Sequence, residues 1–192
     1  MKNLIIKTIV ITLSSIISIV SVAFGALCVF TPTTIASVFE DMGNYRASTF
    51  FYEIEYEQSN DIEDLVVLID KAYGNKDNEG LEEYLGEMIW HKDFHDYCEN
   101  KDANLSANRM PTQDYFVGYY ATVLIENGKF ENSLNMSKSY VETFGYTEFN
   151  PIRAIVNESF NLLTAKQKEE LEETILTFEQ NDFILEDLNK FN

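Results

Sequence analysis

Several residue types are scarce in this chain of 192 residues. It contains two cysteines, three prolines and one tryptophan. Two cysteines are too few for the disulfide framework of a small secreted domain, and we expect no intramolecular disulfide. Three prolines leave long stretches in which a helix can run without interruption.

Basic residues are also scarce. The chain has 14 Lys and Arg residues against 32 Asp and Glu residues, which gives a formal net charge of −18. Such a charge repels the phosphate backbone of a nucleic acid, so we expect no nucleic-acid partner. The hydrophobic share of 45% is nevertheless high enough for a folded domain with a core.

Motifs for common catalytic chemistry are missing as well. The eight glycines form neither a G-x-x-x-x-G-K-S/T loop nor a G-x-G-x-x-G fingerprint, and no segment resembles an EF-hand loop. The only two histidines, His91 and His95, lie in one segment, so their spacing suggests no catalytic triad. We therefore predict no catalytic residue, no cofactor and no bound metal, and we expect that the protein is not an enzyme.

An apolar run near the N-terminus is the clearest feature that is present. The 23 residues from Thr8 to Phe30 carry no charge, and an α-helix needs about 20 such residues to cross a bilayer. Lys2 and Lys7 precede the run, whereas the first charge after it is Glu40. This bias places the N-terminus in the cytoplasm. We expect a single-pass protein of the cell membrane, with a cytoplasmic stub and anchor in residues 1–30 and an acidic extracytoplasmic domain in residues 31–192.

A cleaved signal peptide is the alternative for the same segment. A short basic start, an apolar stretch and the small residues Ala23, Gly25 and Ala26 meet its requirements. The apolar run continues to Phe30, beyond such a cleavage point, which favours an uncleaved anchor that contacts the membrane through residues 8–30.

The segment after the apolar run contains one copy of an internal repeat. Residues 36–48 read ASVFEDMGNYRAS and residues 121–133 read ATVLIENGKFENS, so that Ala36 matches Ala121 and Gly43 matches Gly128. In each copy an apolar helical pattern ends at the glycine, which can adopt the left-handed conformation that closes a helix, and a second pattern follows. Each copy therefore predicts a helical hairpin.

These hairpins resemble the tetratricopeptide repeat (TPR) family. The resemblance is carried by Ile35-Ala36, Phe39, Gly43-Asn44-Tyr45, Ser48 and Tyr52 in the first copy, and by Tyr120-Ala121, Leu124, Gly128-Lys129-Phe130 and Ser133 in the second. Ser48 and Ser133 stand where the family prefers alanine, and Glu55 stands where a small residue is usual. The offset of 85 residues is two and a half repeat periods, so an extra element must lie between the copies.

The rest of the chain supplies further helical patterns. We predict a helix over 61–73, a turn over 74–80 and a helix over 81–90 that extends to about Cys98. Downstream, Pro151 opens a helix to Phe160, Thr164 to Gln167 form a capping box, and residues 169–180 form one helix. Ile184, Leu188 and Phe191 predict a short closing helix. The predicted fold is all-α: a transmembrane helix followed by a TPR-like solenoid of about four hairpins.

The resemblance implies that the first helix of each hairpin lines a groove that holds a peptide. The implied lining residues are Ser37, Glu40, Asp41, Asp64, Lys71, Tyr115, Thr122 and Glu126. Their acidity predicts a basic protein or peptide partner whose binding weakens with salt. We therefore expect an adaptor or scaffold that displays a protein-binding groove outside the cytoplasmic membrane. Tyr115-Phe116 and Tyr119-Tyr120 cover more of a helix than one core stripe needs, so we expect one of them to face a partner.

Two other functions remain open at this point. His91, His95 and Cys98 would share one helix face, and histidine and cysteine bind zinc, so a surface metallohydrolase is one alternative. Lys92 stands where the H-E-x-x-H motif has its catalytic glutamate, and this difference disfavours the metallohydrolase. The other alternative is a structural subunit of a membrane complex, in which the membrane helix packs on others through Ser14, Ser15, Ser18 and Ser21.

Overall fold

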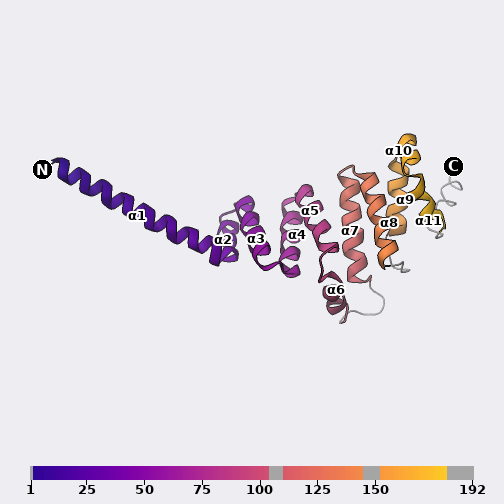
Figure 1. Ribbon diagram of the computed structural model, residues 1–192, viewed down its shortest axis with the longest axis horizontal. Helices are drawn as coiled ribbons and strands as arrows, with labels where there is room; N and C mark the ends of the chain where they lie inside the picture. The colour runs from indigo at the N-terminus through magenta and orange to yellow at the C-terminus, as the bar shows by residue number, and fades with distance from the viewer. Residues whose placement is uncertain (1, 104–109, 145–151, 181–192) are drawn as a thin grey trace. The chain divides into compact units, whose positions relative to one another are not determined.

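The computed structural model describes residues 2–103, 110–144 and 152–180, and every regular element in these ranges is an α-helix (Figure 1). The all-α prediction is therefore confirmed for the described part of the chain. The helices form two compact units, residues 1–68 and 69–192, and the division falls within α4 (Ile62–Asn75).

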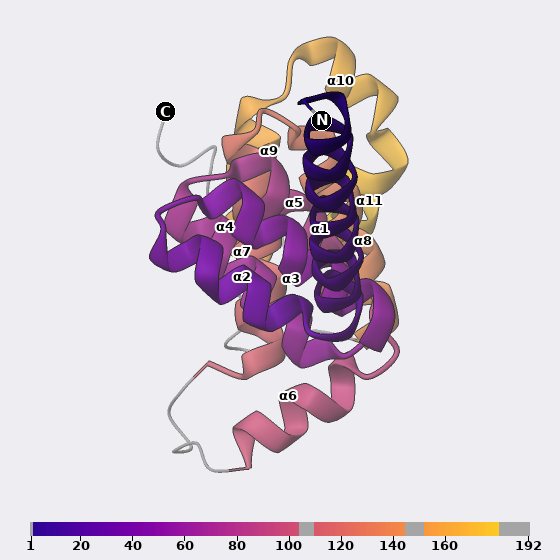
Figure 2. The ribbon, with the colours of Figure 1, turned by 90° about the vertical axis from the view of Figure 1, so that its left-hand side faces the viewer.

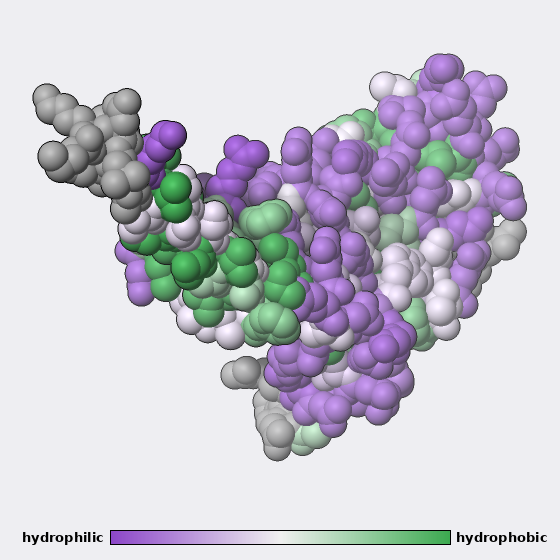
Figure 3. Space-filling view, turned by 60° about the vertical axis from the view of Figure 1, so that its left-hand side comes forward, coloured by the Kyte–Doolittle hydropathy of each residue, from purple (hydrophilic) through white to green (hydrophobic). Residues whose placement is uncertain are grey.

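The first helix, α1 (Lys2–Phe30), contains the apolar run. Its residues Val10–Phe30 form a 21-residue stretch that is long and apolar enough to span a membrane, although a signal sequence meets the same criterion. Their side chains are not packed inside the protein, and Figure 3 shows hydrophobic side chains gathered along this helix. The hydroxyls of Ser15 and Ser18 donate to the carbonyls of Ile11 and Ser14, both at 2.9 Å, and are thereby satisfied within α1.

The first hairpin consists of α2 (Pro32–Asp41) and α3 (Tyr45–Ser59), which pack closely on each other. Pro32 begins α2, where a missing backbone N–H costs nothing. The side chain of Asn44 caps α3 by accepting a hydrogen bond from the Ala47 N–H at 3.3 Å. The rings of Phe39 and Phe51 stack across the hairpin with their centroids 5.5 Å apart.

The internal repeat has the same backbone geometry in both copies. Gly43 and Gly128 both have φ of +73°, as expected for residues that close a helix in the left-handed conformation. In the first copy the Asn44 N–H donates to the Phe39 carbonyl at 2.8 Å. In the second copy, between α7 (Thr112–Glu126) and α8 (Phe130–Phe144), the Lys129 N–H donates to the Leu124 carbonyl at 2.8 Å. The prediction of two matching hairpins is confirmed at this level.

Small buried residues lie where the two helices of each hairpin cross. Ala36, Ser48, Ala121 and Ser133 are all at most 2% exposed. The Ser133 hydroxyl donates to the Ala121 carbonyl at 3.1 Å, which explains how a serine replaces alanine at a buried crossing. In α9 (Ile152–Leu162), the Ser159 hydroxyl donates to the Ser133 hydroxyl at 3.1 Å and joins α9 to the same contact.

In the second unit, α5 (Asn78–Ile89) and α8 both pack on α7, and α9 packs on α7 and α8. The core contains Leu85, Met88, Val117, Leu124, Leu134, Ile152 and Val156. The shorter α6 (Phe94–Asp102) lies at one end of this unit in Figures 1 and 2. There Asp102 accepts a hydrogen bond from the Thr112 N–H at 3.0 Å, so α6 caps the start of α7.

The predicted helix from residue 81 to Cys98 is wrong, because α5 ends at Ile89 and α6 begins at Phe94. In an unbroken helix Phe94 would lie about 140° around the axis from the buried Ile89. The break instead lets Phe94 pack against Phe116 of α7, with ring centroids 6.2 Å apart. Burial of this aromatic ring explains why the chain turns at Trp90.

Other helix and turn boundaries can also be compared with the predicted ones. The turn over 74–80 is shorter, because Asp77 caps α5 by accepting a hydrogen bond from the Gly80 N–H at 3.0 Å. The predicted capping box of Thr164 and Gln167 is present at the start of α10 (Ala165–Glu170). The single helix over 169–180 is wrong, since Leu171 interrupts it before α11 (Glu172–Gln180), which packs on α8. The predicted closing helix with Ile184, Leu188 and Phe191 lies outside the described residues.

Candidate functional site

A stripe of side chains along α7 provides the best candidate site. Tyr115, Tyr119, Thr122 and Glu126 follow one another at the three- and four-residue spacing that puts side chains on one helix face. Tyr115, Thr122 and Glu126 are exposed, and Tyr119 is half-buried between its neighbours. The opposite face of α7 carries Val117, Ala121 and Leu124, which are buried in the core. Because this face packs inward, the stripe faces the solvent.

The C-terminal part of α4 completes this surface. The Tyr73 ring lies edge-on to Tyr119, with centroids 6.4 Å apart and an interplanar angle of 76°. The Tyr115 ring also lies next to Tyr119, with ring centroids 6.1 Å apart. Tyr73 is 68% exposed and Tyr115 is 55% exposed, so two phenol rings present much of their area to solvent. We call Asp70, Tyr73, Tyr115, Tyr119, Thr122 and Glu126 the tyrosine surface.

The tyrosine surface carries negative charge. Burial raises the pKa of Tyr119, and the neighbouring Tyr115 and Tyr73 and the carboxylates of Glu126 and Asp70 raise it further. Tyr119 is therefore a neutral phenol at physiological pH, whereas Asp70 and Glu126 are exposed carboxylates. The hydroxyl of Tyr119 is buried and has no hydrogen-bond partner within the described part of the chain. Faces of aromatic rings next to carboxylates attract cations.

The sequence-predicted binding residues divide between the two units. Tyr115, Thr122 and Glu126 lie together on the α7 stripe, and the half-buried Lys71 lies on α4 in the same unit. Ser37, Glu40, Asp41 and Asp64 belong to the first unit.

Three of these residues in the first unit form local hydrogen bonds. The Ser37 hydroxyl donates to the Thr33 carbonyl at 3.0 Å, and Glu40 accepts a hydrogen bond from the Tyr52 hydroxyl at 3.4 Å. Asp64 accepts one from the Ser59 hydroxyl in the first turn of α4, where a carboxylate also stabilises the helix N-terminus. Asp41 is exposed at the end of α2.

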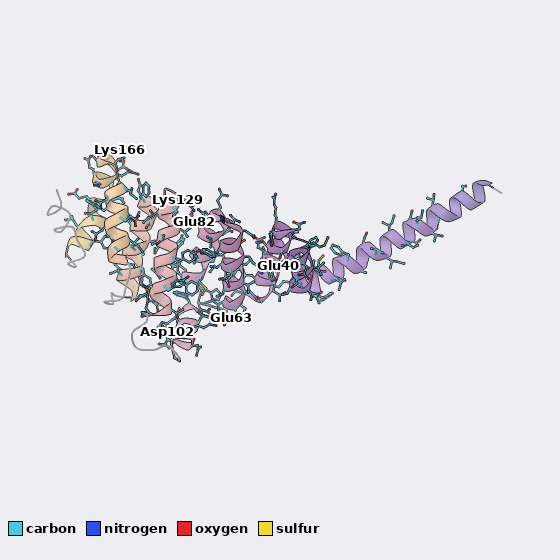
Figure 4. The ribbon with its side chains drawn as sticks, turned by 180° about the vertical axis from the view of Figure 1, so that it is seen from behind. Glu40, Glu63, Glu82, Asp102, Lys129 and Lys166 are labelled. Carbon is cyan, nitrogen blue, oxygen red and sulfur yellow. The ribbon has the colours of Figure 1, made fainter. Side chains whose placement is uncertain are left out.

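A second, acidic concavity lies between α5, α7 and the α7–α8 connection. It is lined by Glu79, Glu82, Glu83, Gly86, Glu87, Tyr120 and Lys129. Glu82 accepts hydrogen bonds from the Lys129 ammonium at 2.6 Å and from the Asn127 amide at 2.9 Å, and Figure 4 shows Glu82 and Lys129 close together. Burial alone would raise the pKa of Glu82, but these hydrogen bonds outweigh it, and the pKa lies below its ordinary value. The ion pair of Glu82 and Lys129 links α5 to the α7–α8 connection and so has a structural role.

The histidine segment does not form the shared helix face that the metallohydrolase alternative requires. His91 lies in the break between α5 and α6, and its Nδ1 accepts a hydrogen bond from the Asp93 N–H at 3.2 Å. His95 is exposed and lies 3.3 Å from Glu99. Cys98 is buried, and burial, followed by the charges of Asp102 and Asp114, raises the pKa of its thiol to about 12. In the part of the chain that the structure describes, no three ligand side chains gather around a common point.

Comparisons of the chain with protein-family models, with curated proteins and with solved structures find no match.

Proposed function

We propose that this protein is a membrane-anchored protein-binding module, and that the tyrosine surface binds a basic segment of another protein. The observation that carries the proposal is the pair of exposed rings, Tyr73 and Tyr115, beside the carboxylates of Asp70 and Glu126. Exposed tyrosine is favoured in protein interfaces because it offers a large rigid area with a polar tip. The carboxylates favour a cationic partner and speed its approach.

The proposed architecture is a TPR-like domain outside the cytoplasmic membrane, tethered by α1. The matched closures at Gly43 and Gly128 and the small buried residues at both helix crossings support this architecture. The stripe on α7 belongs to the first helix of its hairpin, which is the helix that lines the groove in the TPR family. The proposed role is that of an adaptor or scaffold.

The binding surface is tested with the full chain in a non-ionic detergent and a fluorescent peptide of alternating arginine and serine. We expect the double variant Tyr73→Ser/Tyr115→Ser and the double variant Asp70→Lys/Glu126→Lys each to weaken binding by about tenfold, because both the rings and the charges are needed. Binding to the unaltered protein should fall as salt rises.

The matched control is Glu169→Lys/Glu172→Lys, which changes the net charge by the same amount at exposed positions of α10 and α11. It should leave the affinity within about twofold of that of the unaltered protein at 0.15 M salt, since exposed charges farther than about 8 Å from a bound peptide are screened. If this control weakened binding as much as the change at Asp70 and Glu126, the interaction would be a general response to net charge, and the tyrosine surface would be refuted as the site.

The side of the membrane is tested separately in intact cells. A cysteine introduced by Asn192→Cys in a Cys98→Ser background should react with a membrane-impermeant thiol reagent, because the domain lies outside. Protection until the cells are opened would reverse the proposed topology. It would leave the proposed binding surface in place on a cytosolic scaffold.

A further inference from the structure

The first hairpin exposes large apolar side chains close to the end of α1. Val38 is 50% exposed and Met42 is 73% exposed, and the neighbouring Tyr45 is also largely exposed. A scattered apolar side chain on a surface is ordinary, but these three lie within eight residues of one another around the closing Gly43.

The connection between α1 and α2 leaves no linker. Thr31 is the one residue between the two helices, and backbone hydrogen bonds continue through it. Its N–H donates to the Leu27 carbonyl at 2.9 Å, and its carbonyl accepts from the Thr34 N–H at 3.1 Å. Figures 1 and 2 show α2 turning away from the line of α1 directly at this joint.

This joint fixes the depth of the hairpin if α1 spans the membrane. The 21 residues of Val10–Phe30 extend over roughly 30 Å, which is the thickness of the hydrocarbon core. Residue 31 then lies where the hydrocarbon ends, and α2 starts at the level of the lipid headgroups. Apolar and aromatic side chains are stabilised at this boundary.

Val38 lies on the free face of α2, and Met42 is the residue that follows the last turn of this helix. Ala36 is buried against α3, and Val38 lies about 200° around the helix from it, on the opposite side. Met42 follows Val38 by four residues and extends the same face. The carboxylate of Glu40 instead accepts a hydrogen bond from Tyr52 of α3, so it is directed into the hairpin.

We propose that the first hairpin lies on the lipid surface beside α1 and inserts Val38 and Met42 into the boundary between headgroups and acyl chains, with Tyr45 at headgroup level. This inference rests on the proposed anchor and is independent of the tyrosine surface. The hairpin carries more acidic than basic residues, with Arg46 as its one basic residue. The contact is therefore apolar, and the lipid that fits is zwitterionic rather than anionic.

The test uses the full chain in vesicles of phosphatidylcholine. Single cysteines are introduced by Val20→Cys, Val38→Cys, Met42→Cys and Gln58→Cys in a Cys28→Ser/Cys98→Ser background, and each is labelled with the fluorophore NBD. Lipids that carry a nitroxide on the acyl chain then quench labels that contact the bilayer. Val20 reports on the anchor, and the exposed, polar position 58 at the end of α3 is the matched control.

We expect the labels at 20, 38 and 42 to emit at shorter wavelength and to be quenched about twofold or more relative to the label at 58. Quenching at 20 with labels at 38 and 42 that behave like the one at 58 would overturn the hairpin contact and leave the anchor standing. Absence of quenching at 20 would refute the anchor and this inference together. Replacing part of the lipid with phosphatidylserine should weaken quenching at 38 and 42, and an increase would show electrostatic attraction and refute the apolar contact.

Discussion

The closure of the second repeat hairpin gives a sharp prediction for Gly128→Ala. Gly128 has φ of +73°, and a Cβ atom built on it would meet nothing within 4 Å. The substitution therefore causes no clash, and its whole effect comes from the backbone. Alanine in the left-handed conformation costs about 1–2 kcal/mol, while the lower entropy of the unfolded chain returns about 0.4–1 kcal/mol. We expect the free energy of unfolding to fall by about 1 kcal/mol, or about fivefold in the folding equilibrium.

Gly74→Ala provides the matched control. Gly74 lies in the last turn of α4, has an ordinary helical conformation, and likewise has open space around its Cβ position. Alanine favours a helix over glycine by up to about 1 kcal/mol, so this variant should be neutral or more stable. A glycine-to-alanine substitution should therefore lower the free energy of unfolding at position 128 and leave it unchanged or raise it at position 74.

The assay is urea unfolding of the full chain in a mild detergent, followed by the fluorescence of the only tryptophan, Trp90. Gly128→Asn should retain more stability than Gly128→Ala, because asparagine tolerates the left-handed conformation better. A Gly128→Ala variant as stable as the unaltered protein, or a Gly74→Ala variant that loses as much, would refute the assignment of Gly128 as a helix-closing residue.

Three further outcomes follow from the second unit. Asp102→Ala should lower the free energy of unfolding by about 1 kcal/mol, measured by urea unfolding, because Thr112 at the start of α7 loses its cap. Burial raises the pKa of the Cys98 thiol to about 12, so in a Cys28→Ser background Cys98 should react with iodoacetamide at pH 8 only after urea unfolds the protein. Equal reaction rates with and without urea would contradict the burial of Cys98. Lys129→Ala should cost about 0.5–1 kcal/mol at pH 7. The pKa of Glu82 in the folded protein lies below its ordinary value of 4.5, so the difference in free energy of unfolding between the unaltered protein and Lys129→Ala should shrink as the pH falls below 4.5. A difference that stays constant with pH in the urea unfolding curves would exclude the ion pair as its source.

The parts of the fold that the sequence predicts well are those decided by local chemistry. Gly43 and Gly128 each end an apolar helical pattern, and both adopt the expected positive φ. Thr164 and Gln167 form the expected capping box, because its two hydrogen bonds need only residues three positions apart. In both cases the interaction is complete within a few residues.

The parts that the sequence does not predict depend on contacts between distant residues. The break after Ile89 follows from the packing of Phe94 on Phe116, and no local pattern encodes that pair. The same holds for the candidate site. The family resemblance placed Lys71 and Tyr115 on two lining helices, but only the packing of Tyr73 against Tyr119 shows that tyrosines from both helices form one surface.

The hydrogen bonds between Asp102 and Thr112 also make the second unit suitable for engineering. They hold residues 102 and 112 together by the backbone N–H and by the side-chain hydroxyl of Thr112. Because both ends are fixed by these groups, added length between them costs mainly loop-closure entropy, about 0.6 kcal/mol for each doubling of the loop. A peptide tag or a protease cleavage sequence inserted after Ala103 would therefore leave α7 capped. Such an insertion gives a way to purify the protein, or to cut it on demand, without altering either chain terminus.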